Sequence, residues 1–126
     1  RRFFFTRGDA VDLVLFAIEK NKKFSGKILC ADMKSCKLIE IIKVWNQKYG
    51  GSFKVIQGRK GDRLDEYLIG NNELEFTKKI FRRKKTYYLI DFETKIKKPI
   101  KKIISSENAK KLSKKEIYKL LKIGLN

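Results

Sequence analysis

The first pattern along the chain is an amphipathic helix. Thr6 is of a type that caps helix N-termini, and Asp9 and Asp12 stand in or near the first turn, where negative charge suits the helix dipole. Apolar residues then recur at the spacing that gathers them on one side of a helix: Ala10, Leu13, Val14, Ala17 and Ile18. The polar stretch 21–25 ends this predicted helix.

The rest of the chain alternates short apolar runs with two further helical patterns. A second predicted helix, around 38–45, is stopped by Gly50, and a third begins at the S-x-x-E capping box of Ser113 and Glu116. Short runs of β-branched, aromatic and other apolar residues predict four strands: 26–31, 53–56, 64–69 and 86–92.

These elements predict an α/β fold. They are too few and too irregular in order for a doubly wound sheet with its own nucleotide crevice, and the chain has no G-x-G-x-x-G loop and no P-loop. We predict one folded unit over residues 1–94. A basic extended tail and a terminal helix that packs on this unit follow over 95–126, and the tail carries Pro99.

The balance of charges favours partners that carry phosphate. The chain has 32 Lys and Arg against 14 Asp and Glu, a net charge of +18, and such an excess is typical of proteins that bind nucleic acids or nucleotides. In the stretch 78–85, Phe81 lies among six cations, which is one pattern of single-strand binding. A solvated lysine-rich loop is the simpler interpretation, and we favour it.

Several other classes of protein are disfavoured. No apolar run approaches the roughly 20 residues that span a bilayer, and the chain does not start with a signal-peptide pattern. Cys30 and Cys36, without any histidine, are too few ligands for a zinc site. Two idle or buried thiols in a reducing compartment are the better interpretation. We therefore expect a cytoplasmic protein without a structural metal and without a membrane partner.

The stretch GRKGDR, residues 58–63, predicts a tight turn that presents charged groups. Its glycines permit positive φ angles, and Arg59 would project from the end of a strand. A guanidinium can bind a phosphate through two parallel hydrogen bonds, and Asp62 could accept hydrogen bonds from sugar hydroxyls. Arg2, in the stretch RRFFFT, is a candidate second phosphate ligand. Without further support, we favour the simpler interpretations, an ordinary solvated hairpin for 58–63 and an ordinary basic strand end for RRFFFT.

Five blocks in register resemble the C-terminal part of UDP-N-acetylglucosamine 4,6-dehydratases, the polysaccharide-biosynthesis branch of the extended short-chain dehydrogenase/reductases. The blocks are RFFFT…DAVDLVLFAIE, SGKILCADMKSCKLIEIIKVW, GRKGDRLDEYLI, TYYLIDF and SSENAKKLSKKEIYKLL. The chain departs from the family pattern where Phe5 replaces a methionine, where DMKSCKL lacks a proline, and where Asp62 and Arg63 stand for Glu and Lys.

The resemblance implies the substrate-binding half of a two-part enzyme, a small C-terminal domain that lacks the Rossmann half. The arginines that contact the UDP-sugar diphosphate in the family match Arg2 and Arg59, and the acid near ribose and uridine matches Asp62. The weaker matches are Arg1, Lys60 and Glu66. The resemblance also implies that the catalytic residues and the NADP or NAD cofactor lie outside this chain, on a Rossmann domain in the same polypeptide or in a separate chain. Association of this chain into homo-oligomers would be consistent with the resemblance.

Two alternatives stay open at this point. The chain could be a basic nucleic-acid-binding module, as its charge suggests, or a degenerate remnant that folds without catalytic function.

Overall fold

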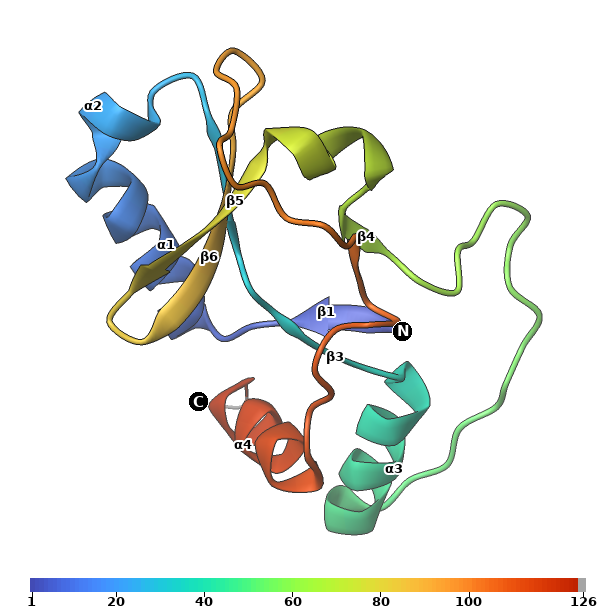
Figure 1. The fold of residues 1–126 in the computed structure, drawn as a ribbon. Coiled ribbons are helices and arrows are strands. Elements are labelled where there is room, and N and C mark those ends of the chain that lie inside the picture. Colours follow the sequence, from blue (N-terminus) through green and yellow to red (C-terminus); the bar gives the residue numbers. More distant parts are fainter. Residues whose placement is uncertain (125–126) are drawn as a thin grey trace.

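The structure is a computed structural model that describes the backbone of residues 1–124 and the side chains of residues 1–122. It is a small mixed α/β fold, as predicted (Figure 1). Its elements, in chain order, are β1 (Arg2–Phe4), α1 (Arg7–Glu19), α2 (Asn21–Phe24), β2 (Ile28–Ala31), β3 (Lys34–Cys36), α3 (Leu38–Tyr49), β4 (Tyr67–Ile69), the 3-10 helix η1 (Asn71–Phe76), β5 (Thr77–Arg82), β6 (Lys85–Ile90), β7 (Ile104–Ser105) and α4 (Lys114–Gly124).

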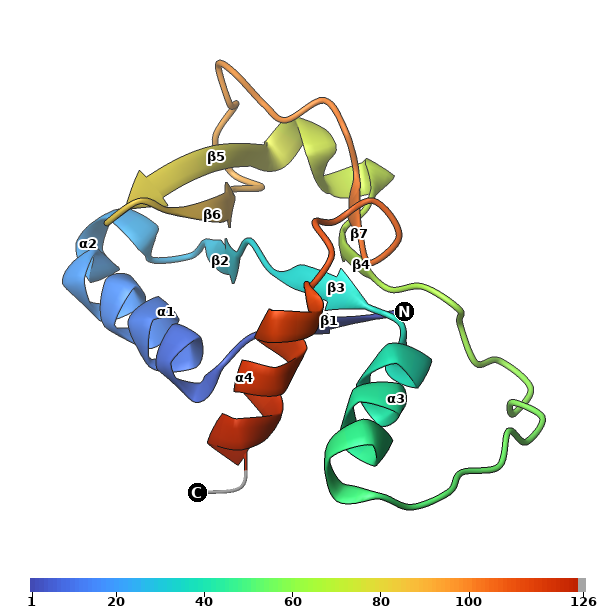
Figure 2. The same ribbon diagram turned by 90° about the horizontal axis from the view of Figure 1, so that it is seen from below.

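Three small antiparallel sheets organise the chain. The largest has the strand order β2-β6-β5, and the other two pair β1 with β3 and β4 with β7. Helices α1 and α2 lie beside the three-stranded sheet (Figure 2), where Phe16 packs on Tyr87 at 5.0 Å and on Phe24 at 5.3 Å between ring centroids. The central strand β6 supplies most of this core, and Leu89 is 1% exposed.

A second apolar cluster lies between α3 and α4. Cys36, Val44 and Ile117 are buried there, and Leu112 and Leu121 pack against them. The cluster therefore packs α4 against Cys36 and α3, which lie in the first half of the chain. Within the described residues no helix is long and apolar enough to cross a bilayer.

The predicted helix boundaries are confirmed by their caps. The Thr6 hydroxyl accepts the Asp9 backbone N–H at 3.1 Å, and the Asp9 carboxylate accepts the Thr6 N–H at 3.0 Å. Ser113 and Glu116 form the same reciprocal pair at the start of α4, with distances of 2.8 and 3.3 Å. Helix α3 ends at Gly50, whose φ of 74° lies in the left-handed region that glycine adopts without strain.

Two strand predictions differ from the structure. Residues 53–56 form no strand, although their pattern predicts one, because no other strand lies beside them in the described part of the chain. Conversely, 78–85 is not a lysine-rich loop: it belongs to the hairpin of β5 and β6. Basic residues hid this strand, since Thr77, at 0% exposure, is its only buried residue, and Ile80 on the opposite face is flanked there by Lys78 and Arg82.

The second half of the chain joins the first through short contacts. The predicted strand 64–69 is shorter in the structure, where only Tyr67–Ile69 pairs, and its partner is β7. The lysine-rich stretch 95–102 has no helix or strand and is mostly exposed. Helix α4 packs on α3. The division into units at 94 and 95 stays a prediction.

Candidate functional site

The turn predicted at 58–63 lies in a long exposed segment between α3 and β4 (Figure 1). The Arg59 backbone N–H donates to Asp62 Oδ2 at 2.8 Å, and the Asp62 N–H donates back to the Arg59 carbonyl at 3.1 Å. Gly61 has a φ of 92°, as a tight turn of this kind requires. Asp62 therefore closes the turn, and the exposed side chain of Arg59 makes no hydrogen bond or ion pair with any described residue.

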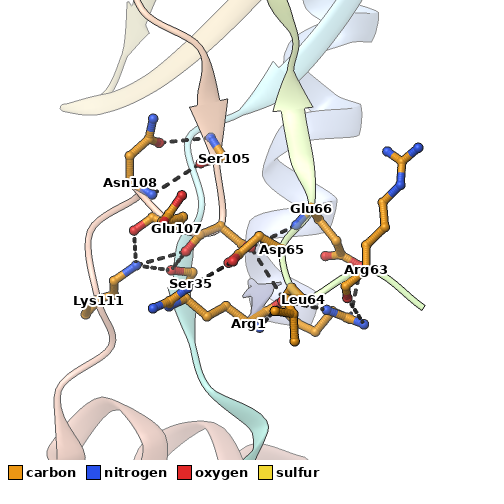
Figure 3. A network of polar contacts seen from close by, with 12 residues as sticks. Arg1, Ser35, Arg63, Leu64, Asp65, Glu66, Ser105, Glu107, Asn108 and Lys111 are labelled. Carbon is orange, nitrogen blue, oxygen red and sulfur yellow. Dashed lines mark hydrogen bonds and ion pairs between the residues drawn. The ribbon is translucent and has the colours of Figure 1, made fainter. Parts of the chain in front are cut away.

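Arg1 and Arg2, at the start of β1, hold the base of this segment (Figure 3). Arg1 pairs with Asp65 at 2.9 Å, and Arg2 Nε lies 3.2 Å from Glu66 Oε1. The guanidinium of Arg2 also donates to backbone carbonyls, at 3.2 Å to Arg63 and 3.4 Å to Leu64. Two of the weaker predicted ligands, Arg1 and Glu66, are thus engaged in ion pairs within the protein.

Two buried serines extend the network to the C-terminal part of the chain (Figure 3). Ser106, which is 0% exposed, donates to Asp65 Oδ1 at 2.9 Å and accepts the Glu66 backbone N–H at 2.9 Å. Ser35 Oγ donates to the Ser106 carbonyl at 2.6 Å. Lys111 Nζ donates to Ser35 Oγ at 3.1 Å and to the Ser106 carbonyl at 2.9 Å. Three distant stretches of sequence therefore share one set of hydrogen bonds.

This network keeps the nearby carboxylate ionised. Burial raises the pKa of Asp65, but the hydrogen bond from Ser106 and the charge of Arg1 outweigh it, so that the pKa lies below its usual range. A charged Asp65 in turn holds Arg1 in place. Sequence reasoning missed Ser35, Ser106 and Lys111, because serine and lysine are common residues and the partners that join these three to the segment at 64–66 lie far away in the chain.

The predicted ligands divide by position along one segment. Arg2 lies at the base of the segment, where it contacts residues 63–66, while Arg59, Lys60 and Asp62 form the exposed turn beyond it. Among the described residues, no hydrogen bond or ion pair joins Arg2 to Arg59. Whether Arg2 and Arg59 bind one diphosphate together stays a prediction.

A cleft of about 460 Å³ lies in a different part of the molecule. It is lined by residues of β1, of the β2–β3 connection, of the β5–β6 turn and of α4, and by none of the predicted ligands. Burial raises the pKa of Asp9 in this cleft, but hydrogen bonds from Lys85 and Thr6 outweigh it and lower the pKa to about 2. Hydrogen bonds from Lys34 and Ser113 lower the pKa of Glu116 to about 2.

Asp9 and Glu116 are therefore charged and paired at neutral pH, which does not suit them to proton transfer. The described residues also contain no group of three or more histidine, cysteine or acidic side chains that could hold a metal ion. Burial raises the pKa of the free thiols of Cys30 and Cys36, so neither is activated as a nucleophile.

Comparison with protein families identifies the relatives of this chain. A family model described as polysaccharide biosynthesis protein matches residues 1–88. The chain belongs to this polysaccharide biosynthesis family. No curated protein matches it. The matched region includes β1 and the turn at 58–63, whereas Ser106 and Lys111, which complete the network of this polysaccharide biosynthesis protein, lie beyond the match.

Proposed function

We propose that this chain is the UDP-sugar-binding part of a nucleotide-sugar 4,6-dehydratase that acts on UDP-N-acetylglucosamine or a similar UDP-sugar. The proposal is supported by one observation above all: an arginine without an internal partner among the described residues is held on a turn whose base is tied to β1. Membership of the polysaccharide biosynthesis family fits this role. The chain would not be active alone.

In the proposed complex, Arg59 is the main phosphate ligand. Its guanidinium is exposed and can offer two parallel hydrogen bonds to a pyrophosphate. Asp62 uses Oδ2 to close the turn, which leaves Oδ1 for a ribose hydroxyl. Lys60 adds positive charge beside them.

Arg2 needs a rearrangement before it can bind a phosphate. Its guanidinium already contacts Glu66 at 3.2 Å and the carbonyls of residues 63 and 64. The Arg2 and Glu66 side chains are 35% and 45% exposed, so their ion pair is weak and could be exchanged for a phosphate. In the protein without bound UDP-sugar, Arg2 positions the segment that carries Arg59.

The nicotinamide cofactor of such an enzyme does not fit this chain. A dinucleotide is commonly bound by a glycine-rich loop between a strand and a helix, and the sequence has none. We therefore place the cofactor and the catalytic residues on a separate cofactor-binding half, and assign to this chain only the binding and orientation of the UDP-sugar.

Calorimetric titration with UDP, in the presence of the cofactor-binding half, tests the proposal. The Arg59→Ala variant should bind UDP about 10- to 100-fold more weakly, because it loses a charge-assisted bidentate contact. Arg63→Ala is the matched control: it removes the same charge from the same segment, but its guanidinium points away from the network (Figure 3). Equal losses in both variants would indicate a general charge effect, and no UDP binding by the unaltered protein would overturn the proposal.

A second candidate function is nucleic-acid binding, favoured by the hairpin of β5 and β6. Phe81 is 68% exposed on this hairpin, the Lys79 ammonium lies 5.5 Å from its ring, and Arg83 and Lys84 form the turn. In this case, a double Lys79→Glu, Arg83→Glu variant should lose binding to single-stranded nucleic acid, and binding should fall steeply with salt. Arg59→Ala should then have little effect. A remnant without binding function should bind neither UDP nor nucleic acid.

A further inference from the structure

The stretch Phe53–Ile56 has the composition of a strand but the exposure of a loop. Val55 and Ile56 are each 78% exposed, and Phe53 is 45% exposed. No backbone hydrogen bond of the described chain involves residues 53–56. Apolar β-branched residues are normally found on strands that pack against a neighbour, so this stretch lacks the neighbour that its sequence calls for.

The surrounding segment is also unusually long. No helix or strand forms between Gly50 and Glu66, whereas connections of more than about 12–15 residues without secondary structure are uncommon in compact domains and are usually functional or disordered. Leu64, near the other end of the segment, is 86% exposed as well. Exposed apolar side chains thus lie on both sides of the turn that carries Arg59.

The position of Arg1 indicates where a neighbouring strand would come from. Its backbone nitrogen donates to the Leu64 carbonyl at the base of the segment (Figure 3). Any polypeptide that leads into β1 therefore passes beside Leu64, at the C-terminal base of this segment. A second copy of the segment is a poor neighbour, because residues 52–61 contain Lys54, Arg59 and Lys60 and no acidic residue, so pairing two copies would bring like charges together.

We propose that residues 53–56 form a β-strand when an extended segment of the cofactor-binding half lies beside them, and that this pairing fixes the turn bearing Arg59. The inference rests on the proposed function, because it requires that half to exist. Backbone hydrogen bonds to an added strand are a common mode of recognition. The pairing would shield Val55 and Ile56 from water and would couple assembly of the two halves to UDP binding.

Hydrogen–deuterium exchange provides the test. In this chain alone, the amides of 53–56 should exchange at rates close to those of an unstructured peptide, because they lack hydrogen bonds. With the cofactor-binding half joined upstream of Arg1, or added as a separate chain, their exchange should slow by about 100-fold or more. Protection that is already present in the chain alone, and that depends on its concentration, would mean that a second copy occupies the stretch and would overturn the proposal.

Two proline variants check the coupling to UDP. Successive N–H groups of a strand point to opposite edges, so Lys54→Pro and Val55→Pro each remove a donor from a different edge. In the assembled protein at least one of them should abolish the protection and weaken UDP binding, while Ser52→Pro, outside the predicted strand, should not. UDP binding without any protection at 53–56 would refute the strand pairing alone. Protection without UDP binding would refute the proposed function alone, and absence of a cofactor-binding half would refute both.

Discussion

Ser106 is the residue on which the anchoring of the turn segment most depends, and Ser106→Ala tests that dependence. Its hydroxyl makes two bonds of 2.9 Å, one to the Asp65 carboxylate and one from the Glu66 backbone N–H. The backbone of residue 106 bonds to Ser35, Lys111 and Glu66 and is unaffected by the substitution. The variant therefore removes side-chain hydrogen bonds from a fully buried position and leaves the backbone contacts in place.

The loss can be estimated from these two bonds. A neutral hydrogen bond contributes about 1 kcal/mol, and a bond to a charged group contributes about 1.5 to 3 kcal/mol. Asp65 keeps its pair with Arg1, and its side chain is 21% exposed, so water replaces part of the lost bond. We expect a decrease of about 2 to 3 kcal/mol in the free energy of unfolding. With about 2.1 cal/mol/K of unfolding entropy for each of the 126 residues, this lowers Tm by about 8 to 11 °C.

Thermal unfolding followed by circular dichroism measures this change. Ser52→Ala is a suitable control, since Ser52 is exposed and has no recorded hydrogen bond among the described residues, and its Tm should stay within about 2 °C of the unaltered protein. UDP affinity of Ser106→Ala should also fall, because Asp65 and Glu66 lie at the base of the segment with Arg59. A Tm within about 2 °C of the unaltered protein would show that the reasoning about the network is wrong.

Two further predictions concern the turn of the hairpin and the response to acid. Arg83 and Lys84 have φ angles of 46° and 66°, which suit asparagine and glycine. Replacing the pair by Asn-Gly should therefore stabilise the protein by about 1 kcal/mol and raise Tm by a few degrees. An unchanged or lower Tm would contradict this. The second concerns three carboxylates with pKa values lowered to about 2: Asp9, Asp91 and Glu116. Because these values lie below those of the unfolded chain, the stability that the carboxylates contribute is complete above about pH 5 and is lost as the pH falls towards 2. Urea unfolding should show this decline, and Asp91→Asn, which removes the titrating negative charge paired with the Lys27 ammonium, should make it shallower. An unchanged slope would count against the assignment.

Local signals in the sequence were sufficient for the three longer helices, α1, α3 and α4, but they missed the short helices α2, in the stretch 21–25 that was expected only to end α1, and η1. Thr6 with Asp9, Ser113 with Glu116, and Gly50 mark helix ends through contacts within a few residues, and the structure confirms each of them. The family resemblance also rested on local blocks, and the match over residues 1–88 confirms its broader part, membership of a polysaccharide biosynthesis family.

The strands depended on neighbours that a local pattern does not show. Residues 53–56 are apolar but have no partner strand in the described chain, whereas lysine-rich β5 is a strand because six of its residues pair with β6. A strand needs hydrogen bonds to a second segment, while a helix makes its own.

For the candidate site, the sequence alone determined the charged turn at 58–63, because two glycines and an acid specify it within six residues. Only the tertiary structure decided what holds that turn. Its base is bound by Arg2 and, through Asp65, by Ser106. These contacts join positions 61 and 41 residues apart, and only the packing of β1, β4 and β7 brings them within hydrogen-bonding distance.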